Sequence, residues 1–320
     1  FTKTNAIGKN AAVVLFQFVD DGKHGIPLEI VKHTPDFALF EAGCLVRQLI
    51  LRDVIQEFTK HMIQCHEIDD GCLAYHSLRT SLGENGKMNN ASINSFANHA
   101  PKLEWVREFF DMGNEYWELN SLGPNQVSMF KRFLRDTGLI DKNNKTTKLF
   151  DVIVSIGWES GTAWGLIASN FAYNPQFNWY INNLDVGTFY QRDTVSDLLI
   201  NDGVKKNDAT SIINAFKRFC ELPLGTVLNW GAVYENGRQI DSLYRNKCAI
   251  VDNRVILYSL LLFVENCDEN KEFTLSWLMD ELVDRNGVSP SKVFGLDYEE
   301  MKSALMGLSQ KYPDFIIASF

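Results

Sequence analysis

Histidine and cysteine residues cluster in the first third of the chain, where their spacing could support metal binding. All six histidines lie before residue 100, together with three of the six cysteines. His61 and Cys65 are four residues apart, as are Cys72 and His76, so each pair would share one face of a helix. Zinc and iron–sulfur clusters accept such ligands. However, an acidic turn at 67–71 separates the two pairs, and the sequence has no Cys-x2-Cys pair. We therefore interpret these residues as buried thiols and surface histidines, and we predict no metal and no other cofactor.

The sequence also lacks the common signatures of catalytic sites. It has no Gly-x4-Gly-Lys-Ser/Thr phosphate-binding loop, no Gly-x-Gly-x-x-Gly, no His-Glu-x-x-His and no Gly-x-Ser-x-Gly. Neighbouring carboxylates such as Asp69 and Asp70 are ordinary in a turn and receive no acid–base role. We predict no catalytic residue in this chain and no enzymatic activity of its own, which leaves binding as the expected activity.

A local excess of basic residues lies in the segment 123–148. Six Lys and Arg against two Asp give it a net charge of +4, whereas the whole chain has a net charge of −9. A protein covered in positive charge is thereby excluded, but a local phosphate-binding patch is not. Pro124 suits the first turn of a helix and Gly138 its end, so we predict an amphipathic helix between them.

Nine polar or basic residues of this segment are candidate contacts to double-stranded DNA. Helical spacing puts Ser128, Arg132 and Arg135 on one face, opposite an apolar side with Phe130 and Leu134. The lysines that follow fall on a predicted wing tip, where a clamp on the DNA backbone is expected. The alternative is a solvated helix face on a domain that contacts proteins. The candidate nucleic-acid-binding residues are Asn125, Gln126, Ser128, Lys131, Arg132, Arg135, Lys142, Lys145 and Lys148.

The elements that must position these residues are predominantly helical. We predict a mainly α fold of tandem helix-turn-helix and winged-helix units with short β wings, because apolar residues recur at helical spacing and no series of alternating strands is visible. After residue 123, a helix, a glycine stop, two apolar residues and a polar tip follow in the order of a winged helix. Strands are expected only as short wings near 139–150 and 314–320.

Four parts are predicted along the chain. They are an N-terminal helical, helix-turn-helix-like unit at 1–80, a linker with a short helix at 81–120, a winged-helix unit with an aromatic helical extension at 121–185, and tandem helix-turn-helix units at 186–320. We interpret the dense aromatic residues of the third part as core, because rings contribute so much buried area.

The composition is that of a soluble globular protein, with 45% apolar and 22% charged residues. No run of about 18 uncharged apolar residues exists, which argues against a membrane span and a membrane partner. The start at Phe1, without an apolar signal core, suggests a fragment or processed product rather than a secretory precursor. We expect a cytoplasmic location with reduced thiols.

Several stretches carry a family resemblance. They are Asp70-Gly-Cys-Leu-Ala-Tyr-His-Ser-Leu, the helix at 122–140 that begins Leu-Gly-Pro-Asn-Gln, Asn170-Phe-Ala-Tyr-Asn-Pro at the start of 170–180, the segment 208–223, and Val293-Phe-Gly-Leu-Asp. Together they resemble the C-terminal region of large phosphoadenosine-phosphosulfate-reductase-like proteins of bacteria. A related free-standing domain occurs among genes for DNA phosphorothioation and phage defence. The resemblance covers about residues 65–320.

What this resemblance implies about activity is limited. Our first hypothesis for the function is a DNA-binding or DNA-positioning module of a bacterial phage-defence or DNA-modification system, built from tandem winged helices. Its partners would be double-stranded DNA and other subunits or domains of such a complex. Two alternatives stay open: an accessory C-terminal region of a sulfur-transfer enzyme, and a protein-interaction scaffold, which the acidic net charge favours. The reductase-like domain is not within these residues, so sulfur activation is not carried over. Relatives can carry ferredoxin-type cysteine clusters, but only Cys44, Cys65 and Cys72 stand near the Gly-Cys-Leu motif here.

The cysteine and histidine spacing generates the first testable prediction. Elemental analysis of the purified chain should find no stoichiometric zinc or iron, because these spacings do not close a tetrahedral site. A content of about one metal ion per chain that disappears when Cys65 and Cys72 are replaced would contradict this prediction.

Overall fold

A computed structural model describes residues 17–18, 93–250, 252–267, 273–280, 286–313 and 315–319 of the chain. The predicted unit at 1–80, with His61, Cys65, Cys72 and His76, falls outside the described residues apart from a two-residue strand. The described part is mostly helical, which confirms the mainly α prediction. None of its helices has the length and apolar character needed to cross a membrane.

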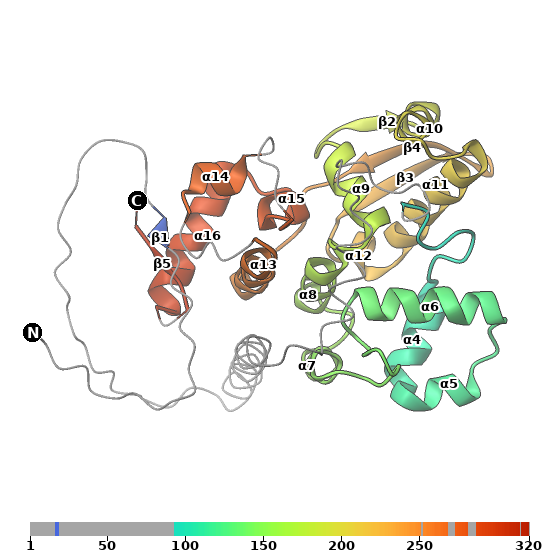
Figure 1. Ribbon diagram of the computed structural model, residues 1–320, viewed down its shortest axis with the longest axis horizontal. Helices are drawn as coiled ribbons and strands as arrows, with labels where there is room; N and C mark the ends of the chain where they lie inside the picture. The colour runs from blue at the N-terminus through green and yellow to red at the C-terminus, as the bar shows by residue number, and fades with distance from the viewer. Residues whose placement is uncertain are drawn as a thin grey trace, which may run out of the picture.

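Seven helical segments lie in the first half of the described chain (Figure 1). They are α4 (Leu103–Met112), the 3-10 helix η1 (Gly113–Glu115), α5 (Tyr116–Leu119), α6 (Pro124–Asp136), α7 (Lys148–Ile156), α8 (Gly161–Phe171) and α9 (Pro175–Asn183). The second half contains α10 (Arg192–Asn201), α11 (Lys206–Glu221), α12 (Pro223–Thr226), α13 (Asn253–Asn266), α14 (Leu275–Met279), α15 (Pro290–Phe294) and α16 (Tyr298–Lys311).

Helix α6 has the bounds that the sequence predicts. Pro124 is its first residue, and the Gln126 side chain accepts a hydrogen bond from the backbone N–H of Gly123 in a capping arrangement. Past its last turn, Gly138 has a φ of +75°, in the left-handed region that glycine adopts without strain. Phe130, Phe133 and Leu134 are its buried residues, so the helix is amphipathic as expected.

The predicted wing after α6 is smaller than expected. A single antiparallel bridge joins Ile140 to Thr146 and closes a short loop. The prediction of a strand at 149–150 is wrong, because α7 already begins at Lys148. The Thr147 hydroxyl accepts a hydrogen bond from the backbone N–H of Phe150, and this N-cap starts a helix where a returning strand was expected.

A three-stranded antiparallel sheet contradicts the prediction that strands occur only near 139–150 and 314–320. It consists of β2 (Phe189–Gln191), β4 (Gln239–Arg245) and β3 (Gly231–Asn236), in that spatial order. Asn236 pairs with Gln239, and Gly237, with a φ of +65°, takes the first position of the two-residue turn between them. Such a glycine between two strand-forming runs is a hairpin signal. The predicted C-terminal strand is present as β5 (Ile317–Ala318), which pairs in parallel with β1 (Gln17–Phe18).

One hydrophobic core extends across the described helices and the sheet. A series of ring contacts follows it from Phe130 to Phe133, Phe171, Phe177 and Trp230, with centroid separations of 6.3, 5.3, 4.4 and 4.5 Å. These residues come from α6, α8, α9 and the position directly before β3, which confirms the interpretation of the aromatic stretch as core. The predicted units at 121–185 and 186–320 share this core, and their boundary stays a prediction.

Helix α13 connects this core to the C-terminal helices. It is buried on nearly all sides and packs against α8, α15 and α16. Gly165 allows the close approach of α8, because a Cβ there would lie 2.5 Å from Cγ1 of Val255. In Figure 1, α8 accordingly lies next to both α7 and α13.

The Phe130 ring generates a stability prediction. It is fully buried and contacts the rings of Trp105, Phe109 and Tyr116 at 5.6–6.1 Å. Phe130→Ala should lower the free energy of unfolding by about 3–5 kcal/mol in urea titrations, because it removes a large buried ring and leaves a cavity.

Phe189→Ala is the matched control, because this ring is 57% exposed. Its removal should cost less than about 1 kcal/mol. Equal destabilisation by the two substitutions would contradict the described packing of α6.

Candidate nucleic-acid interface

The outer side of α6 presents a polar stripe. Asn125, Ser128 and Arg135 are exposed, whereas Phe130 and Leu134 on the other side are completely buried. The exposed positions are three and seven residues apart, which keeps them on one side of the helix. From Asn125 to Arg135 the stripe rises about 15 Å, a length comparable to about four base-pair steps of duplex DNA.

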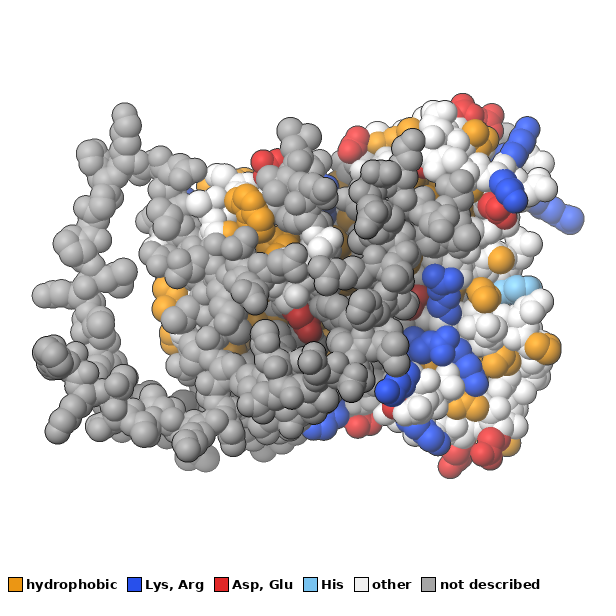
Figure 2. All heavy atoms as spheres, in the orientation of Figure 1, with side chains coloured by type: hydrophobic (Ala, Val, Ile, Leu, Met, Phe, Trp, Pro, Cys, Tyr) orange, Lys and Arg blue, Asp and Glu red, His pale blue; other side chains and the backbone are white. Residues whose placement is uncertain are grey.

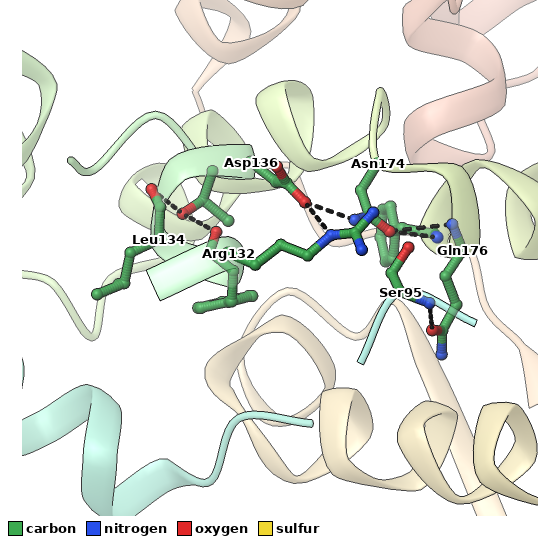
Figure 3. Close-up of polar contacts among 9 residues, drawn as sticks. Ser95, Arg132, Leu134, Asp136, Asn174 and Gln176 are labelled. Atoms are coloured by element: carbon green, nitrogen blue, oxygen red, sulfur yellow. Dashed lines mark hydrogen bonds and ion pairs between the residues drawn. The ribbon is translucent and has the colours of Figure 1, made fainter. Parts of the chain in front are cut away.

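Arg132 departs from the position that the sequence predicts. Its Nε lies 3.6 Å from Oδ2 of Asp136, and its side chain is only 34% exposed. Asn174 donates a hydrogen bond of 2.6 Å to the same carboxylate oxygen. Figure 3 shows the Arg132 side chain extended along α6 toward Asn174. Arg132 is therefore engaged in an internal ion pair, whereas the side chain of Arg135 is exposed.

This ion pair ends a longer chain of polar contacts. The Asn174 side chain caps α9 by accepting hydrogen bonds from the backbone N–H groups of Gln176 and Phe177. The buried Gln176 side chain in turn accepts a hydrogen bond of 2.9 Å from the backbone N–H of Ser95 (Figure 3). Burial raises the pKa of Asp136 above its ordinary value, although the Asn174 hydrogen bond and the charges of two arginines act in the opposite direction.

Two other candidate residues also have internal roles. The carbonyl oxygen of the Gln126 side chain is occupied by the N–H of Gly123, at 2.9 Å. The Lys131 Nζ lies over the Trp117 ring, 4.7 Å from its centroid, in a cation–π contact. Both side chains are half-buried. Sequence reasoning missed Trp117, because no local pattern pairs it with a lysine 14 positions later.

The three lysines beyond α6 are all exposed, but they do not share one element. Lys142 and Lys145 lie in the loop closed by the Ile140–Thr146 bridge. Lys148, which the sequence places on the wing tip, is instead the first residue of α7. A contact of 3.5 Å between Nη1 of Arg135 and Oδ1 of Asn144 connects the exposed stripe of α6 to the loop.

The sign of the net charge changes between residues 103–119, which are acidic, and residues 123–148, which are basic. Residues 103–119 carry five exposed acidic side chains and a single arginine, Arg107. Figure 2 shows Lys and Arg side chains gathered over the region of α4–α6, and acidic side chains at the lower edge near α5. An anionic ligand would therefore favour α6 and its loop over the acidic residues of α4 and α5. The acidic side chains are Glu104, Glu108, Asp111, Glu115 and Glu118.

Two cysteines in the described part of the chain have thiols of low reactivity. Burial raises the pKa of both Cys220 and Cys248, that of Cys248 to about 12. A thiol with such a pKa is a poor nucleophile and metal ligand. Across residues 93–250 and the later described segments, no group of three or more His, Cys, Asp or Glu is arranged to hold a metal ion.

Comparisons with known proteins identify no relative of this chain. No protein-family model, no curated protein and no solved structure matches the chain.

Arg132 pairs with Asp136 whereas Arg135 is exposed, and this difference generates a prediction about the pH dependence of stability. Asp136 has a raised pKa in the folded state, so its protonated form favours folding and this contribution is lost as the pH rises through that pKa. When the carboxylate of Asp136 is ionised, the positive charge of Arg132 reduces the free-energy cost of burying it. Arg132→Ala should therefore destabilise the protein by about 0.5–1 kcal/mol at pH 7, and by less as the pH falls and Asp136 is protonated.

Arg135→Ala serves as the comparison, because no ion pair joins this exposed side chain to Asp136 in the described structure, and its charge lowers the pKa of Asp136 less than the charge of Arg132 does. Urea unfolding of both variants between pH 4 and pH 7 measures the difference. A pH-independent destabilisation by Arg132→Ala, or an equal destabilisation by Arg135→Ala, would argue against the ion pair.

Proposed function

We propose that α6 and the loop after it bind the phosphate backbone of double-stranded DNA. In this proposal the chain is a non-catalytic DNA-binding or DNA-positioning module of a bacterial phage-defence or DNA-modification system. The observation that carries it is the Arg135–Asn144 contact, which joins the exposed polar stripe of α6 to the loop with the exposed Lys142 and Lys145. Cationic side chains beside a polar helix face are typical of a DNA-binding helix.

The residues of this surface divide into two roles. Arg135, Lys142, Lys145 and Lys148 are exposed cations, and they contact phosphates. Asn125 and Ser128 lie near the N-terminus of α6, where a helix inserted in the major groove brings side chains to base edges. Arg132, Lys131 and Gln126 hold this surface in place through their internal contacts, so they contribute less to binding than the sequence predicts.

A protein-interaction scaffold is the second candidate function, and a different surface favours it. The outer face of the sheet carries three rings in contact, with Phe189 4.2 Å from Tyr244 and 5.4 Å from Tyr234 between centroids. Phe189 is 57% exposed and Tyr234 49%. Exposed aromatic groups are enriched where proteins bind one another.

Salt-dependent DNA binding distinguishes these functions. Affinity for a labelled duplex, measured by fluorescence anisotropy, should fall with added salt, because cations on the protein release counterions from the DNA. The double variant Lys142→Ala/Lys145→Ala should lower the slope of log affinity against log salt by about 2, roughly one for each phosphate that is no longer neutralised. Arg135→Ala should lower the slope by about 1.

Lys205→Ala/Lys206→Ala is the matched control, because it removes two exposed lysines at the N-terminal end of α11. This variant should bind like the wild type. Absence of measurable duplex binding by the wild type, or equal weakening in the two double variants, would leave the scaffold as the better proposal.

A further inference from the structure

The loop that carries Lys142 and Lys145 is ordered by its own first residue. Oδ1 of Asp141 accepts hydrogen bonds of 2.8 Å from the backbone N–H groups of both Asn143 and Lys145. Asn144 has a φ of +60°, the left-handed conformation that asparagine tolerates better than most residues. These hydrogen bonds fix the turn itself, but they do not fix where the turn sits relative to α6.

Two residues far upstream attach the loop to the rest of the unit. Asn114 in η1 donates from Nδ2 to the Thr146 hydroxyl and accepts from the Thr146 backbone N–H, both at 3.0 Å. Trp117 in α5 donates from its indole N–H to the carbonyl oxygen of Asn144, at 3.1 Å. Trp117 thus holds the loop at Asn144, and Asn114 holds it at Thr146. Both groups lie about 30 residues earlier in the chain.

Trp117 is also joined to α6. Its ring packs against Phe109 and Phe130 at 5.8 and 6.3 Å, and its face receives the Lys131 ammonium. The same indole therefore holds the loop through its N–H and a cation of α6 through its face. Asn144, which accepts the indole hydrogen bond through its backbone, contacts Arg135 through its side chain.

We propose that Asn114 and Trp117 are positioning residues that set the separation between the loop lysines and the cations of α6. With this separation fixed, both groups of cations meet one phosphate backbone at once. A loop that is already ordered loses less conformational freedom on binding, so more of the interaction energy appears as affinity. This inference rests on the proposed function, because it assumes that the surface binds DNA.

Asn114→Ala and Trp117→Phe test the inference without removing any cation. Trp117→Phe keeps a ring against Phe109 and Phe130 but loses the N–H donor to the loop. Each variant should bind duplex DNA about threefold to tenfold more weakly at every salt concentration, with the slope of log affinity against log salt unchanged. Hydrogen exchange of the 139–147 amides in the free protein should be faster than in the wild type.

Asn182→Ala is the matched control, because Asn182 is an exposed, hydrogen-bonded asparagine on α9. It should change neither affinity nor loop exchange, and urea unfolding checks that the variants remain folded. A wild-type protein that binds DNA, together with Asn114→Ala and Trp117→Phe variants of unchanged affinity or unchanged loop exchange, overturns this inference alone. A wild-type protein that binds no DNA overturns the proposed function and the inference with it.

Discussion

Continuous aromatic packing from α4 to β3 is the constraint on which the rest of this structure depends. Phe109 and Phe130 join α4 to α6, Phe133 and Phe171 join α6 to α8, and Phe177 continues the ring packing to Trp230. Rings bury large areas and prefer a few mutual orientations, so each ring pair fixes the angle as well as the distance between elements. The orientation of α6 is thereby determined by two sets of rings on two of its sides.

The candidate binding surface is a consequence of this packing. Because Phe130 faces α4 and α5 while Phe133 faces α8, the stripe of Asn125, Ser128 and Arg135 is a side of α6 that the other described elements leave exposed. The border of that stripe is where Arg132 pairs with Asp136 beside the capping residue of α9. The surface is therefore part of the fold, and its shape depends on α9 as well as on α6.

Local signals made α6 predictable, and non-local contacts explain what the sequence did not reveal. Pro124, Gly138 and the apolar spacing between them act within one helix, so the bounds and the buried face of α6 are confirmed. The second strand of the wing was mispredicted because the hydroxyl of Thr147 caps a helix. Helix α7 therefore begins at Lys148, where a returning strand was expected. The environment of Arg132 depends on Asn174, 38 residues away from Asp136, and no sequence period encodes such a contact. The hairpin around Gly237 did carry a local signal, but the prevailing helical periodicity masked it.

The central claim is that α6 and the loop after it are the DNA-binding surface. Hydrogen exchange of the wild-type chain, compared with and without a duplex at low salt, tests this claim most directly, because it locates the binding surface without altering any residue. With DNA bound, exchange should be slower in the loop at 139–147 and in α6, and unchanged in β3 and β4. Protection confined to the sheet around Phe189 and Tyr234, or no protection at all, would contradict it.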